Sequence, residues 1–75
     1  MLSKEIENEC REHGEIVALE HSKPAISCTR IREAMERIEQ LEDIYGLDAY
    51  TAFIAGYDDW WEELWSYLAR ENAND

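Results

Sequence analysis

Apolar residues recur every three or four positions along most of this chain, a spacing typical of one face of an α-helix. One series steps by four and three residues without interruption and comprises Tyr50, Ile54, Tyr57, Trp61, Leu64 and Leu68. A strand over residues 16–19 would lack a second strand to pair with. The periodicity therefore predicts an all-α fold, and the 75 residues suffice for a single domain, a small bundle of three helices over residues 1–75.

The first helix is expected over residues 3–21. Ser3 is a good N-cap, and an apolar stripe follows it at helical spacing through Ile6, Cys10, His13 and Val17. Gly14 interrupts this segment, so either a short helix ends there or one helix continues. A glycine inside a helix costs only about 1 kcal/mol relative to alanine, and the unbroken stripe favours a single helix.

The second helix is expected over residues 27–45. Pro24 marks the break before it, because proline lacks an amide donor and disfavours helical geometry at the preceding residue. Gly46 suits the positive φ that commonly follows a helix C-terminus. The stripe between these two residues is the most regular in the chain and comprises Ile31, Ala34, Met35, Ile38, Leu41, Ile44 and Tyr45.

The third helix is expected over residues 48–70, with Asp48 as its N-cap and a frayed tail over residues 71–75. Gly56 raises the question whether this helix is continuous. Asp59 and Glu62 resemble a capping box, which would start a new helix, whereas the apolar series continues through Tyr57 without interruption. We favour one helix, with a kink or a split at Gly56 as the alternative.

The net charge of the chain is −11, from 18 acidic and seven basic residues. The electrostatic field of this negative charge repels nucleic acid and anionic membranes and attracts basic surfaces. Direct nucleic-acid binding is therefore not expected. No run approaches the roughly 18 apolar residues of a membrane span, and the first residues lack the apolar core of a signal peptide, which predicts a cytoplasmic protein. Cys10 and Cys28 are too few for a disulfide framework.

The charge is distributed unevenly. Residues 1–22 carry −4 and residues 47–75 carry −6, whereas residues 23–46 carry only −1. The bases of this middle segment are Lys23, Arg30, Arg32 and Arg37. They can pair with acids one turn away in the same helix, or they can bridge to the neighbouring helices or to a second copy of the chain. Pairs within the helix are the favoured interpretation.

No pattern of residues points to catalysis or to a cofactor. The only soft-ligand set that could form a tetrahedral zinc site is Cys10, His13, His21 and Cys28. In one continuous helix, however, His21 lies about 12 Å along the axis from His13, too far for a shared ion. The three glycines are too far apart for a phosphate-binding loop. The sequence thus predicts a non-enzymatic protein without catalytic residues, bound metal or cofactor.

The stretch over residues 57–68 contains all three tryptophans and four carboxylates. On a helix, Trp61, Leu64, Trp65 and Leu68 share one face, and we expect them to pack into the core. The acids fall mainly on the opposite face, and three tryptophans within six residues cannot all point inward. The predicted partner-binding residues are therefore Asp58, Asp59, Trp60, Glu62 and Glu63.

These features suggest a binding protein whose acidic surface occupies a basic, nucleic-acid-binding surface of a partner protein and blocks it. In size, acidity and lack of motifs, the chain is similar in kind to the small phage and mobile-element proteins that inhibit host defence, including anti-CRISPR proteins. The alternative is an obligate helical homodimer or a small adaptor, in which the aromatic face is the subunit interface. A homodimer would also support the small core of a chain of this length.

Overall fold

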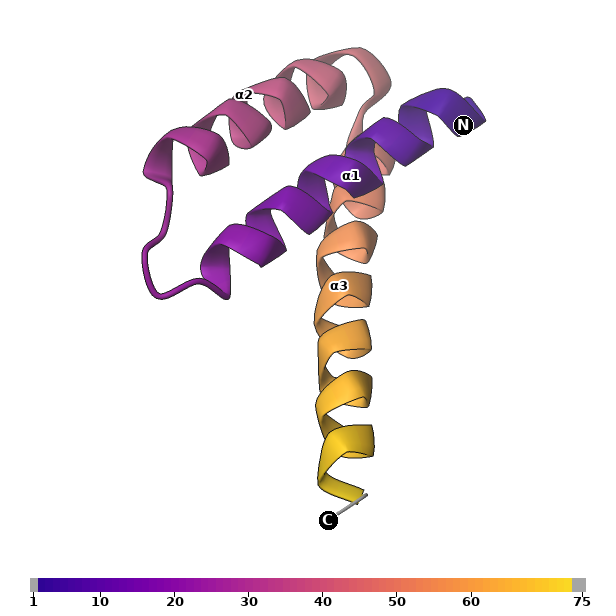
Figure 1. Ribbon diagram of the computed structural model, residues 1–75. Helices are drawn as coiled ribbons and strands as arrows, with labels where there is room; N and C mark the ends of the chain where they lie inside the picture. Colours follow the sequence, from indigo (N-terminus) through magenta and orange to yellow (C-terminus); the bar gives the residue numbers. More distant parts are fainter. Residues whose placement is uncertain (1, 74–75) are drawn as a thin grey trace.

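The computed structural model describes residues 2–73 as three helices joined by short connections (Figure 1). They are α1 (Lys4–His21), α2 (Cys28–Tyr45) and α3 (Leu47–Ala73). No strand occurs in this part of the chain, and the predicted all-α bundle of three helices is confirmed. None of the three helices is long and apolar enough to cross a membrane.

The helix ends follow local capping chemistry. The hydroxyl groups of Ser3 and Ser27 accept hydrogen bonds from amides in the first turns of α1 and α2, each at 3.3 Å. Gly46, with φ 77°, alone separates α2 from α3, so α3 begins at Leu47, one residue earlier than predicted. The helix also continues through Ala73, where a frayed tail was predicted; residues 74–75 lie outside the described residues.

The backbones of α1 and α3 contact each other directly at two glycines. A Cβ atom at Gly14 would overlap the carbonyl oxygen of Phe53 and lie 2.8 Å from the amide nitrogen of Tyr57. A Cβ atom at Gly56 would overlap the carbonyl oxygen of Arg11 and lie 2.7 Å from its Cα atom. Both helices continue through their glycines, as the unbroken apolar periodicity predicted. Glycine is required here because no side chain fits between the two backbones.

The core lies where α1 and α2 pack against the first half of α3. Small residues bring α1 and α3 close together, and larger side chains from α2, together with Phe53, fill the remaining space. The buried apolar residues are Cys10, Val17, Ala18, Ala34, Ile38, Leu41, Ala49, Ala52 and Phe53. Three of them come from the predicted stripe of α2, but the last turn of that stripe, Ile44 and Tyr45, is exposed.

Two arginines of α2 bind carboxylates of α1. The Nε atom of Arg37 donates a hydrogen bond to Glu9 at 2.7 Å, and Nη1 of Arg30 donates to Glu20 at 3.3 Å. Of the two arrangements that the sequence allows for these bases, bridging between helices is thus present at both arginines. The proximity of the Arg37 guanidinium, through its hydrogen bond and its charge, lowers the pKa of Glu9.

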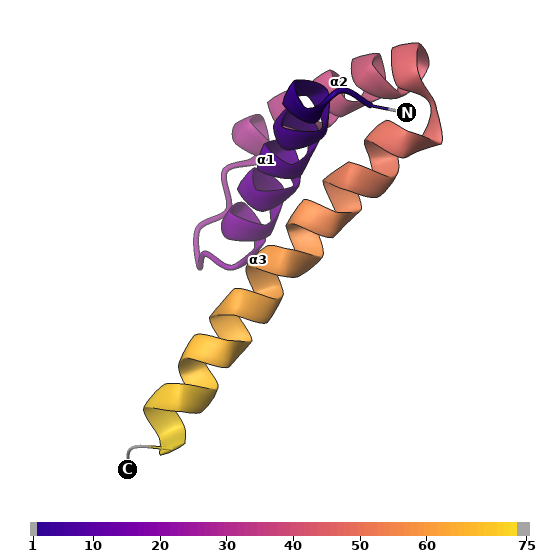
Figure 2. The ribbon, with the colours of Figure 1, turned by 90° about the vertical axis from the view of Figure 1, so that its right-hand side faces the viewer.

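α3 is much longer than the helices that cover it, with 27 residues against 18 in each of α1 and α2. At about 1.5 Å per residue, the difference amounts to roughly 13 Å. Figure 2 shows that α3 continues well beyond α1 and α2. From Glu62 to Glu71 every side chain is exposed except Leu64, which is half-buried. We call residues 62–73 the projecting segment.

Candidate protein-interaction surface

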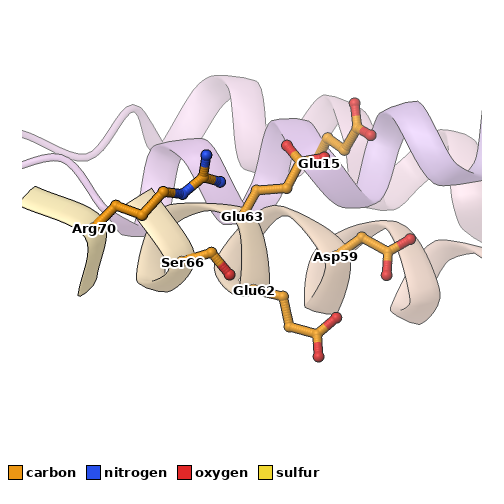
Figure 3. A pocket seen from close by; sticks show the side chains of 6 residues that line it. All are labelled: Glu15, Asp59, Glu62, Glu63, Ser66 and Arg70. Atoms are coloured by element: carbon orange, nitrogen blue, oxygen red, sulfur yellow. The ribbon is translucent and has the colours of Figure 1, made fainter. Parts of the chain in front are cut away.

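An acidic cleft lies between α1 and the second half of α3, with a volume of about 760 Å³. It is lined by Glu15 of α1 and by five residues of α3, namely Asp59, Glu62, Glu63, Ser66 and Arg70 (Figure 3). Four of its six lining side chains are carboxylates, and Arg70 is the only base among them. We call this the acidic cleft; it brings together three of the five residues predicted to bind a partner.

The carboxylates of the cleft differ in their surroundings. Asp59 forms an ion pair with Arg11 of α1, and both side chains are partly buried. Glu62 and Glu63 are exposed. In Figure 3, Glu63 extends toward Glu15, whereas Glu62 points away from it. Asp59 therefore ties α3 to α1, and Glu15, Glu62 and Glu63 are better placed to meet a ligand.

Asp58 and Trp60 lie outside the acidic cleft. Asp58 is exposed. Trp60 is half-buried and packs edge-on against Trp61, with 5.2 Å between the ring centroids and an interplanar angle of 86°. Together with Ile16 and Leu19 of α1, Trp60 lines a separate hollow of about 340 Å³. Trp60 thus covers part of α1 and remains partly exposed.

The expected packing of Trp65 and Leu68 into the core is wrong. Trp65 is 63% exposed, Leu68 is 39% exposed, and Trp61 and Leu64 are only half-buried. The reason is length, because α1 and α2 end before they can cover the projecting segment (Figure 2). Trp65, which was expected in the core, is therefore the most exposed of the three tryptophans, and Trp60 and Trp61 are both half-buried.

Among the residues that the structure describes, Glu20 is the one charged residue that is buried, with only 1% of its surface exposed. No sequence pattern singled it out. Its carboxylate accepts hydrogen bonds from Nζ of Lys23 at 2.8 Å and from the amide of Ser27 at 3.1 Å, and it also pairs with Arg30. The Lys23 hydrogen bond, followed by that of Ser27 and by the nearby positive charges, lowers the pKa of Glu20 despite its burial. Glu20 therefore holds the α1–α2 connection in place.

The residues considered for zinc are dispersed. Cys10 is buried, and burial raises the pKa of its thiol, whereas Cys28 is exposed. Nε2 of His13 lies 3.7 Å from Oε1 of Glu9, and Nδ1 of His21 lies 3.0 Å from the hydroxyl oxygen of Tyr57. Within residues 2–73, no three His, Cys, Asp or Glu side chains are grouped so that they could hold a metal ion.

The surface that could serve a function therefore has two parts on α3. One is the acidic cleft, and the other is the exposed apolar surface around Trp65 and Leu68. Arg11 and Glu15 were missed from sequence, because their positions beside Asp59 and Glu63 depend on the crossing of α1 and α3. Comparison with protein-family models, with curated proteins and with solved structures finds no match to this chain.

Proposed function

We propose that this protein is a non-enzymatic acidic binding protein that occupies a basic, nucleic-acid-binding surface of a partner protein and thereby blocks it. In kind, it would act as small phage or mobile-element inhibitors of host defence do, including anti-CRISPR proteins. The observation that carries the proposal is the gathering of Glu15, Glu62 and Glu63 around one open cleft, in a chain of net charge −11.

The chemistry of a phosphate-binding surface supports this function. Such a surface presents lysine and arginine side chains, which form equally strong charge-assisted hydrogen bonds with carboxylates. Acids four residues apart on a helix, such as Asp58 and Glu62, repeat at about 5–6 Å and present a row of negative charge as a nucleic-acid strand does. Because Asp58, Glu62 and Glu63 sit on one continuous helix, their spacing is held before the partner binds.

The experiment is affinity capture from a lysate of the native host, followed by binding measurements on the purified partner. The partner should be a nucleic-acid-binding protein, its DNA or RNA should compete with the acidic protein, and the affinity should fall as salt rises. Capture alone does not support the proposal; competition with the nucleic acid does.

Matched charge variants locate the contact. The variant Glu15→Gln, Glu62→Gln, Glu63→Gln should bind the partner up to about 100-fold more weakly, from up to about 1 kcal/mol per exposed ion pair. The control Glu33→Gln, Glu36→Gln, Glu39→Gln removes the same charge from exposed positions on α2 and should bind nearly as wild type. Equal losses in both variants, or an affinity insensitive to salt, would contradict the proposed surface.

A second candidate function is structural, as an obligate helical homodimer or a small adaptor. The observation that favours it is the exposure of large apolar side chains on α3, with Trp65 at 63% and Leu47 at 74%. Sedimentation of a monomer at micromolar concentration would refute the obligate dimer and would leave partner blocking unaffected.

A further inference from the structure

We propose that two copies of this chain associate through an antiparallel pairing of their α3 helices. This inference keeps the aromatic face of the homodimer candidate as the interface but predicts a weaker, concentration-dependent dimer, and it does not depend on partner blocking. Its basis is an apolar strip along α3, which comprises Leu47, Tyr50, Ile54, Trp61, Trp65 and Leu68. Four of these side chains are exposed, and Ile54 and Trp61 are half-buried.

The strip has the shape of a helix–helix interface. At 3.6 residues per turn, its six side chains fall within about 60° of one another, and they extend for roughly 32 Å along the helix axis. The strip lies about 160° around the helix from the face that packs on α1, which carries Ala49, Ala52 and Gly56. A second helix can therefore lie along the strip without displacing α1.

The placement of the apolar residues is the same from either end. The strip steps by three, four, seven, four and three residues, so it is symmetric about the point between Tyr57 and Asp58. A two-fold axis at this point brings Leu47 and Tyr50 of one copy against Trp65 and Leu68 of the other. The exposed side chains at both ends of the strip are then covered at once. A ligand docked on the projecting segment alone would leave Leu47, 74% exposed, uncovered.

The projecting segment would also gain stability from a second helix. Its side chains from Glu62 to Glu71 are exposed except for half-buried Leu64, and most helical stability in proteins comes from the packing of an apolar face. The exposed parts of Tyr50 and Trp65, at 43% and 63%, amount to roughly 160–270 Å² per copy if each ring system buries about 150–250 Å². Even for two copies and with Leu47 and Leu68 added, this area stays below the about 1,200–2,000 Å² that stable interfaces bury, so we expect a weak dimer with a dissociation constant on the order of 10 micromolar.

Charge distinguishes this interface from the acidic cleft. Asp58 borders the strip beside the two-fold axis, so the two copies of Asp58 approach each other and repel. Added salt screens this repulsion and should tighten the dimer, whereas it should weaken binding to a basic partner. Asp59 and Glu63 lie on the other side of α3, and the acidic cleft stays open in the dimer.

Cross-linking of cysteine variants with a short bifunctional maleimide tests the antiparallel arrangement. Cys28 is exposed, so the background is Cys28→Ser, in which buried Cys10 stays protected. A mixture of the Leu47→Cys and Leu68→Cys proteins should give covalent dimers, and each protein alone should give few. Cross-linking of each protein with itself would indicate a parallel pair and would overturn this inference while leaving the homodimer candidate in place.

Sedimentation velocity provides the second measurement. The Cys28→Ser protein should dimerise at tens of micromolar, more strongly in high salt, and Trp65→Ser should shift it to monomer with unchanged helicity. The matched control is Tyr67→Ser, because Tyr67 is 58% exposed but lies away from the strip, and it should dimerise normally. A monomer at these concentrations, equal effects of the two substitutions, or dissociation by salt would each refute the proposed interface.

Discussion

Replacing Gly14 or Gly56 by alanine tests whether the close contact of α1 and α3 holds the fold together. In an open helix this change stabilises by about 1 kcal/mol, because alanine is the better helix former. Here the new methyl group would overlap a backbone carbonyl, of Phe53 or of Arg11. Backbone atoms cannot rotate away as a side chain can, so the two helices must separate.

The size of the effect follows from this separation. Overpacking typically costs about 1–3 kcal/mol, and a gap of about 0.5–1 Å forfeits a quarter to a half of the dispersion energy of the contacts that it opens. After the gain of about 1 kcal/mol in helix propensity is subtracted, we expect a net loss of up to about 2 kcal/mol for either variant. A chain of 75 residues has roughly 4–11 kcal/mol of stability, and a loss of about 2 kcal/mol should lower its melting temperature by roughly 8–16 °C.

Urea unfolding followed by far-UV circular dichroism measures the change. The control is the exposed Glu39 of α2, where the alanine variant should be more stable than the glycine variant by about 1 kcal/mol. The double variant Gly14→Ala, Gly56→Ala should lose less than the sum of the single losses, because the first substitution already separates the helices. Stabilisation by either single substitution would refute the close backbone contact.

The other predictions concern burial and charge. Because the folded-state pKa of Glu20 is lowered, its contribution to stability is present above its ordinary pKa and is lost as pH falls through the lowered value. The free energy of unfolding, measured in urea, should thus fall less with decreasing pH for Glu20→Gln than for wild type. An equal fall in both proteins would contradict this role. In native protein, iodoacetamide should modify exposed Cys28 rapidly and buried Cys10 only slowly, as mass spectrometry over time would show; equal rates would place Cys10 at the surface. Phe53→Ala should cost about 3–5 kcal/mol in chemical unfolding, because Phe53 is buried, and Tyr67→Ala should change stability by less than about 0.5 kcal/mol.

Periodicity and capping were enough to predict the three helices. Ser3, Pro24 and Gly46 each act locally, through a hydroxyl cap, a missing amide and a positive φ, and such effects are legible in a few residues. The continuity of α1 through Gly14 was also predictable, because the apolar stripe persists on both sides. The reason why position 14 must be glycine could not be predicted, because the contact with Phe53 joins segments that are far apart in sequence.

The candidate site was predicted less well. The apolar face that holds Trp65 looks like a core face in any helical projection, and only the lengths of α1 and α2 decide whether another helix covers it. A comparison of the predicted lengths could have raised this question, because the third helix was already expected to be the longest. The ion pair of Asp59 with Arg11 depends on the angle at which α1 crosses α3, and periodicity contains no information on that angle.

α3 also has a mechanical consequence. It is a stiff rod that touches α1 at Gly56, with about 22 Å of helix from there to Glu71 and about 14 Å in the other direction to Leu47. A force perpendicular to α3 therefore exerts a larger torque on the crossing with α1 when it acts at Glu71 than when it acts at Leu47. A partner that binds the tip and tilts it would strain the contact between Gly14 and Phe53. The hydrogen-exchange rates of buried amides there would then report a binding event about four helical turns away.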